Sequence, residues 1–114
     1  MTPGASGIPG HKITVEQGAE RVRVVHDGQV VADSTRALVL RETGCPVRYY
    51  LPAEDVAMNL LTPSDTTTYC PFKGTASYWS LPDAADAVWS YPEPKADVAA
   101  IKGHLCFYEV EVVG

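Results

Sequence analysis

The chain has 114 residues, of which 46% are hydrophobic and 20% are charged, and its formal net charge is −5. This length fits one domain, and the composition argues against disorder along most of it. The acidic balance argues against a nucleic-acid partner, because neutralising phosphates requires a basic face. No apolar segment approaches the ~20 residues that span a bilayer, and no signal peptide is recognisable, so we expect a cytoplasmic protein with no membrane partner.

Proline and glycine, which interrupt regular secondary structure, are frequent in this sequence. Nine prolines and nine glycines separate short runs of valine, threonine and tyrosine, a pattern typical of an all-β fold with at most short helices. The three cysteines, Cys45, Cys70 and Cys106, form no Cys-x-x-Cys pair. Their number and spacing favour reduced thiols over disulfides or a zinc site, so we expect no metal and no cofactor.

The first half of the chain contains four candidate strands. Residues 1–10 are rich in glycine and proline and are predicted to be a flexible lead-in to a single domain over residues 11–114. The strands are expected at residues 11–16, as an edge strand, and at 21–26, 29–34 and 36–42. Asp27-Gly28 between two of them predicts a two-residue hairpin turn that pairs Val25 with Val30 and Val24 with Val31, with both faces covered near the turn.

The middle of the chain is punctuated by proline. Residues 36–42 are apolar on both faces, which is typical of an inner strand. Residues 48–51 are predicted to form a strand, 52–56 a single helical turn, and 62–65 a loop.

The most distinctive stretch spans residues 66–80. A turn at Lys73-Gly74 would place Cys70 opposite Ser77 and Tyr69 opposite Tyr78, whereas a wider loop starting at Pro71 would shift these pairs. Beyond it, the pattern predicts a loop at 82–86, a strand at 87–91, a short helix at 95–102 with Val98 and Ile101 inward, and a long last strand at 104–112.

Seven segments together resemble a known family. They are residues 11–15, 30–34, 40–42, 50–56, 69–79, 89–91 and 103–108, of which Tyr69-Cys70-Pro71-Phe72-Lys73-Gly74 is the most specific. The chain is thereby identified as similar to the domain of unknown function 427 family. The resemblance implies a β-tent, in which two antiparallel sheets pack at a steep angle.

The same resemblance brings two functional expectations that the residues do not support. Other β-tent proteins hold a structural zinc through two Cys-x-x-Cys knuckles, which this sequence lacks. The family naming also carries a nucleotidyltransferase label. Nucleotidyl transfer usually needs carboxylates that hold Mg²⁺ beside a phosphate-binding loop, and neither Asp-x-Asp with Gly-Ser nor Gly-x-x-x-x-Gly-Lys is present.

Individual residues leave alternatives open. Cys70 could be a nucleophile if Lys73 supplied a positive charge and His104 a base, or it could simply be buried. Lys73 could meet an anionic ligand, although a lysine at a turn is more often solvated. Arg41 and Glu42 should project to opposite faces and could line a pocket mouth or form local ion pairs with Asp55 or Glu54.

Six of the ten aromatic residues lie between positions 69 and 91, more than one thin core easily encloses. Aromatic side chains beside a few charges favour a small-ligand or partner-binding module. The candidate ligand-binding residues are Arg41, Glu42, Tyr50, Asp55, Cys70, Lys73, Trp89 and Tyr91. One alternative is an enzyme of nucleotidyl-transfer, phosphoryl-transfer or cysteine-dependent chemistry. Another is a structural subunit that forms homodimers through exposed strand edges.

Overall fold

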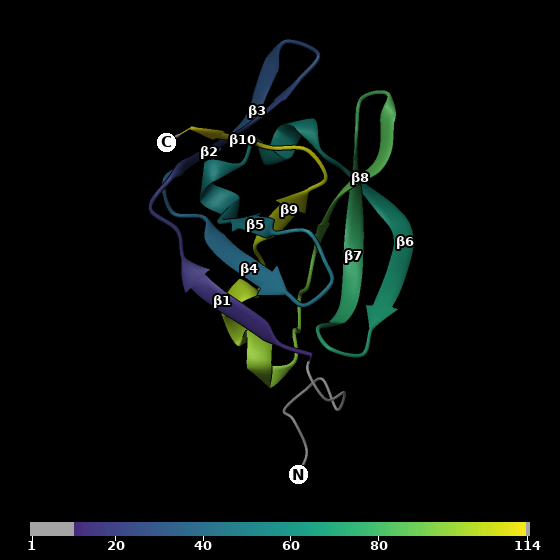
Figure 1. Ribbon diagram of the computed structural model, residues 1–114. Helices are drawn as coiled ribbons and strands as arrows, with labels where there is room; N and C mark the ends of the chain where they lie inside the picture. The colour runs from purple at the N-terminus through teal and green to yellow at the C-terminus, as the bar shows by residue number, and fades with distance from the viewer. Residues whose placement is uncertain (1–10, 114) are drawn as a thin grey trace.

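The computed structural model describes residues 11–113 and contains two antiparallel sheets (Figure 1). The predicted lead-in at residues 1–10 lies outside the described residues. In spatial order, the strands of the larger sheet are β1 (Ile13–Gln17), β4 (Leu38–Glu42), β5 (Arg48–Leu51), β9 (Leu105–Phe107), β8 (Ala84–Ser90), β7 (Gly74–Leu81) and β6 (Thr62–Cys70). Those of the smaller sheet are β10 (Glu111–Val113), β2 (Arg21–His26) and β3 (Gln29–Ser34).

The helical segments are three short 3₁₀ helices, η1 (Ala53–Asp55), η2 (Met58–Leu60) and η3 (Ala96–Ile101). The predicted turns at 52–56 and 95–102 correspond to η1 and η3, and Val98 and Ile101 of η3 are buried as expected. The predicted all-β class with two antiparallel sheets is confirmed. Within residues 11–113, no helix is long and apolar enough to cross a bilayer.

The central strands of the larger sheet contribute to a core on each face, because successive side chains of a strand point to opposite sides. One set of their side chains packs with the valines of β2 and β3 in an inter-sheet core: Leu51, Val88 and Leu105. Their sequence neighbours Tyr50, Trp89 and Cys106 pack on the opposite face, against η3, in what we call the concave-face core. The candidate site lies beside the concave-face core.

The β2–β3 hairpin differs from its predicted register. His26 pairs with Gln29 and Val25 with Val30 as predicted, but a bulge between Val24 and Val25 sets Val24 opposite Ala32 instead of Val31. The expectation that both faces are covered is wrong, because Val25 and Val30 are 43% and 44% exposed. The hairpin tip extends past the larger sheet (Figure 1), so only its inward valines are buried.

Two predicted loops belong to strands instead. Residues 62–65 start β6, which lies at the edge of its sheet and whose register is irregular between Pro63 and Thr67. An edge strand tolerates proline because the missing N–H would face solvent. The loop predicted at 82–86 is only a two-residue turn, since Leu81 pairs with Ala84 and Asp83 adopts a φ of 62°.

The central hairpin, β6–β7, turns through the wider loop that starts at Pro71. Cys70 pairs with Gly74 and Thr67 with Ser77, so the register that starts from a Lys73-Gly74 turn is wrong. Gly74 has a φ of 115°, and a Cβ at this position would lie 3.2 Å from the carbonyl oxygen of Glu93. Glycine therefore allows the loop to pack against the segment before η3.

The predicted strand over residues 104–112 is two strands in different sheets. β9 is fully buried between β5 and β8, whereas β10 pairs with β2. The chain crosses between the sheets through Tyr108, Glu109 and Val110. This crossing carries Tyr108 to the candidate site.

Candidate functional site

A largely buried ion pair joins distant parts of the larger sheet. Glu42 ends β4 and Lys73 lies in the β6–β7 loop, and in the sheet order three strands, β5, β9 and β8, separate β4 from β7. The Lys73 Nζ nevertheless lies 2.6 Å from Glu42 Oε1. The sheet must therefore curve until the side that contains β4 approaches the side that contains β6 and β7. The concave face of the curved sheet becomes a sheltered space.

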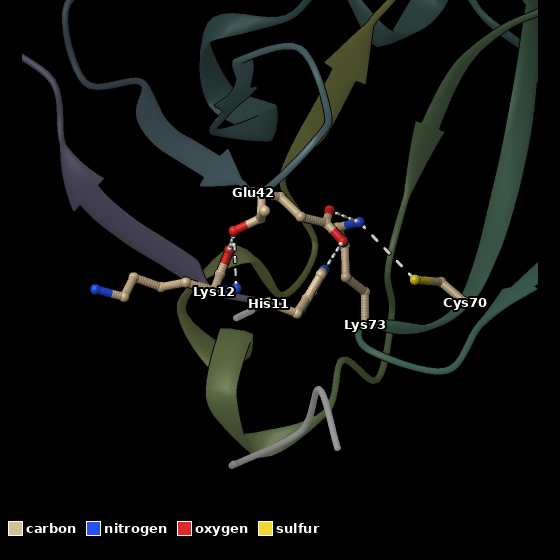
Figure 2. Close-up of polar contacts among 6 residues, drawn as sticks. His11, Lys12, Glu42, Cys70 and Lys73 are labelled. Atoms are coloured by element: carbon tan, nitrogen blue, oxygen red, sulfur yellow. Dashed lines mark hydrogen bonds and ion pairs between the residues drawn. The ribbon is translucent and has the colours of Figure 1, made fainter. Parts of the chain in front are cut away.

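His11 completes the contacts of the Glu42 carboxylate. Its Nε2 lies 3.0 Å from Glu42 Oε2, and its ring stacks on Phe72 with 4.2 Å between ring centroids. Phe72 and Lys73 are neighbours in the same loop, so the stacking and the ion pair hold that loop together against the start of β1. Figure 2 shows Glu42 between His11 and Lys73.

Lys73 is not the solvated loop tip that its turn position suggested. Its side chain is 13% exposed and that of Glu42 is 7% exposed. The Lys73 Nζ also lies 3.8 Å from the Sγ of Cys70, which is half-buried. The imidazole that contacts Glu42 belongs to His11, whereas the Nδ1 of His104 lies 3.1 Å from the Lys102 carbonyl oxygen.

A cavity of about 280 Å³ opens beside the ion pair. We call it the Glu42 pocket, and its lining residues are Leu40, Glu42, Cys45, Pro46, Arg48, Tyr50, Lys73, Tyr78, Trp89, Tyr91 and Tyr108. Five aromatic rings and three charged side chains thus face one space. Such a mixture of apolar walls with a few polar groups is typical of small-molecule sites.

Arg48 lies over two of the aromatic rings. Its guanidinium carbon is 5.3 Å from the ring centroid of Trp89 and 5.7 Å from that of Tyr108. The two rings contact each other, with 4.5 Å between centroids. Within residues 11–113, no carboxylate pairs with Arg48. The rings hold its charge by cation–π attraction and leave its N–H groups available.

Burial keeps the nearby phenols and the deepest thiol neutral. The pKa of Tyr50 is raised mainly by burial, and its hydroxyl accepts a hydrogen bond from Trp89 Nε1 at 3.4 Å. Burial also raises the pKa of Tyr91, with a smaller contribution from nearby Cys70. The pKa of Cys106 rises to about 12, again chiefly through burial. At neutral pH these groups are therefore protonated donors and not charges.

Two sequence-predicted site residues lie elsewhere. Arg41 points away from the Glu42 pocket and pairs with Glu16 of β1 at 3.3 Å, with both side chains exposed. Asp55 pairs with Arg36 at 3.0 Å and accepts a hydrogen bond from the Ser34 hydroxyl. These contacts, that of Arg36 first, hold the pKa of Asp55 below its ordinary value. Their positions give both residues a structural explanation.

The other candidates gather at one place: Glu42, Tyr50, Lys73, Trp89 and Tyr91 line the Glu42 pocket, and Cys70 contacts Lys73. Arg48, Tyr78, Tyr108 and His11 were missed. Arg48 could have been found, because it lies two residues before Tyr50 and shares its face of the strand. Tyr108 could not, because its position follows from the break between β9 and β10.

The side chains that line the Glu42 pocket determine which chemistry it can perform. Within residues 11–113, no three or more His, Cys, Asp or Glu side chains gather in a way that could hold a metal ion. The Glu42 pocket does provide fixed cations, one carboxylate and a primary amine. These groups can bind an anion and transfer protons.

The fold and the pocket define a small all-β domain of two antiparallel sheets with a sheltered aromatic and charged cavity. The chain belongs to the family described as domain of unknown function DUF427, which matches residues 14–114. A search of curated proteins found no match.

Proposed function

We propose that this protein binds a small organic anion in the Glu42 pocket. The observation that carries the proposal is Arg48, a cation held against the faces of Trp89 and Tyr108 with no carboxylate partner within residues 11–113. A guanidinium presents N–H donors in a planar fork that matches a carboxylate or phosphate. The Glu42 pocket therefore offers an anchor that the folded chain itself does not use.

The charge balance inside the pocket supports an anion. Glu42 is the only acid among the lining residues described, and Lys73 neutralises it. Arg48 then leaves this pocket with an excess positive charge, although the whole chain carries −5. In a sheltered site such a charge attracts anions more strongly than it would in bulk water.

The size and the walls restrict the ligand further. The cavity has a volume of about 280 Å³, which is close to the lower end of the range typical of small-molecule sites. The aromatic rings favour a flat, apolar body, and Tyr78 and Tyr91 offer hydroxyl groups in the same pocket. We therefore expect a compact carboxylate or phosphate with a planar or apolar portion.

Calorimetric titration with 4-methylbenzoate and its neutral isostere 4-methylbenzamide tests the proposal. We expect the carboxylate to bind and the amide to bind at least about tenfold more weakly, since a charge-assisted bidentate contact is lost. Arg48→Gln should remove this preference. Arg41→Gln is the matched control and should leave binding unchanged, because Arg41 lies outside the pocket.

A phosphonate of similar shape distinguishes carboxylate from phosphate recognition within the same series. The proposal fails if the anions and their neutral isosteres bind alike. It also fails if a folded Arg48→Gln protein binds the anions as tightly as the unmodified chain.

A further inference from the structure

We propose that Lys73 forms an imine with the carbonyl carbon of a small oxo acid held in the Glu42 pocket. This inference rests on the proposed anion binding and extends it from recognition to covalent chemistry. Its basis is the juxtaposition of a sheltered primary amine, a carboxylate in direct contact with it, and a separate cation that can anchor the ligand.

The amine of Lys73 is positioned to meet a ligand. The Lys73 side chain is 13% exposed and lines the cavity. A lysine ammonium has three N–H donors. The Lys73 ammonium makes two such contacts, to Glu42 Oε1 at 2.6 Å and to Cys70 Sγ at 3.8 Å. The third donor has no partner within residues 11–113, so a ligand in the Glu42 pocket can reach this nitrogen.

The Glu42 carboxylate is positioned to take a proton from Lys73. An amine attacks a carbonyl only after it has lost a proton, and the Glu42 carboxylate is in direct contact to accept that proton. His11 Nε2 lies 3.0 Å from the other oxygen of the same carboxylate, and His11 Nδ1 has no partner within the described residues. Figure 2 shows the three side chains in sequence, from Lys73 through Glu42 to His11. Glu42 can thus hold the proton and return it.

The balanced reaction needs no other reactant. The lysine ammonium gives a proton to Glu42, and its neutral nitrogen forms a bond to the carbonyl carbon while the C=O π bond breaks. A second N–H proton moves to the resulting alkoxide oxygen to give a carbinolamine. Glu42 then returns the proton to the hydroxyl group, the C–O bond breaks, and water leaves. The products are a protonated imine, an ionised Glu42 and one water molecule.

The groups in the Glu42 pocket restrict the chemical identity of the ligand. Arg48 and Lys73 line the same small cavity and offer different chemistry, a planar guanidinium fork and a primary amine. A ligand that uses both must carry a carboxylate together with an aldehyde or ketone. The small cavity further limits it to a compact 2-oxo acid or a carboxylated aromatic aldehyde.

Reductive trapping tests the imine. The folded protein is incubated with 4-carboxybenzaldehyde and cyanoborohydride, and intact mass and peptide mapping locate the adduct. We expect one adduct, on Lys73, forming at least about tenfold faster than adducts on Lys12, Lys95 or Lys102. Benzaldehyde, which lacks the carboxylate, should label Lys73 more slowly by a similar factor because Arg48 no longer anchors it.

Variants provide matched controls. Lys73→Arg keeps the positive charge beside Glu42 but cannot form an imine, so the adduct should disappear. Lys95→Arg removes a lysine outside the Glu42 pocket and should leave labelling unchanged. Labelling spread evenly over the lysines of the unmodified protein overturns the inference, and this readout does not depend on whether a variant folds.

Binding of 4-methylbenzoate separates failure of the inference from failure of the proposed function. If this anion binds through Arg48 while 4-carboxybenzaldehyde gives no Lys73 adduct, anion binding holds and the imine is wrong. If neither molecule binds, both proposals are wrong.

Discussion

The Glu42 carboxylate is the residue on which the site depends. It accepts contacts from Lys73 and His11 while only 7% of its side chain is exposed. A charged pair in such a place gains little over apolar side chains of similar volume, but the removal of one partner leaves the other charge without compensation. The two members of the pair should therefore be strongly coupled.

We expect Glu42→Gln to lower the free energy of unfolding by about 3 kcal/mol, because it leaves the Lys73 ammonium buried without its counter-charge. The double variant Glu42→Gln/Lys73→Gln should be more stable than the single variant. Urea unfolding of the two single variants and the double variant gives the coupling free energy. Glu16→Gln, which breaks only the exposed contact with Arg41, should leave stability nearly unchanged.

Additive losses of stability would contradict this prediction. If the loss in the double variant equals the sum of the losses in the two single variants, Glu42 and Lys73 do not stabilise each other.

For individual residues, the sequence predicted which residues belong to the site better than it predicted where their side chains lie. Strand alternation correctly indicated that Arg41 and Glu42 face opposite sides. It could not show which of them faces inward, because that depends on the curvature of a sheet whose ends meet. Asp55 was misplaced for a related reason: its partner Arg36 is 19 residues away in the sequence.

The β6–β7 loop is the element that brings the site together. Both a Lys73-Gly74 turn and a wider loop from Pro71 fit the local sequence, and the structure has the wider one. Contacts outside the hairpin accompany this choice, since Phe72 stacks on His11 and Lys95 N–H donates to the Lys73 carbonyl. Local turn chemistry therefore could not decide the register.

Gly74 provides a test of that loop. Gly74→Asn should destabilise the protein by more than about 1 kcal/mol, because the residue has a positive φ and its new Cβ would approach the Glu93 carbonyl. Gly28→Asn is the control, since nothing lies within 4 Å of a Cβ there and asparagine tolerates the φ of +78°. Thermal unfolding of both variants provides the comparison. Equal losses would show that packing of the loop on residues 93–95 contributes nothing.

The break between β9 and β10 could not be predicted from the sequence, for a different reason. Residues 104–112 contain no glycine or proline to interrupt them, so they were predicted to form one strand. The chain instead leaves the larger sheet after Phe107 because β10 pairs with β2. A long-range pairing of this kind leaves no local signal.

At the scale of the whole molecule, the two cores share their strands. β5, β8 and β9 each give side chains to both the inter-sheet core and the concave-face core. Neither core can lose its packing while the other keeps these three strands in place. We therefore expect the described part of the chain to unfold as one cooperative unit.

The two tryptophans report on the two cores separately. Trp79 packs against the inter-sheet core and Trp89 lies in the concave-face core. In Trp79→Phe and in Trp89→Phe, the urea midpoint from the remaining tryptophan's fluorescence should coincide with the midpoint from far-ultraviolet circular dichroism of the same variant. A fluorescence midpoint at lower urea in either variant would show that its core unfolds separately.

β9 has a consequence for the order in which the molecule is made. This three-residue strand fills the gap between β5 and β8, and both of these strands precede it in the chain. During synthesis, both neighbours have already left the ribosome and have unpaired edges before Leu105 emerges. Such edges pair readily with other chains. A chain that stops before β9 should therefore be prone to aggregation, and the larger sheet cannot close until β9 has been translated.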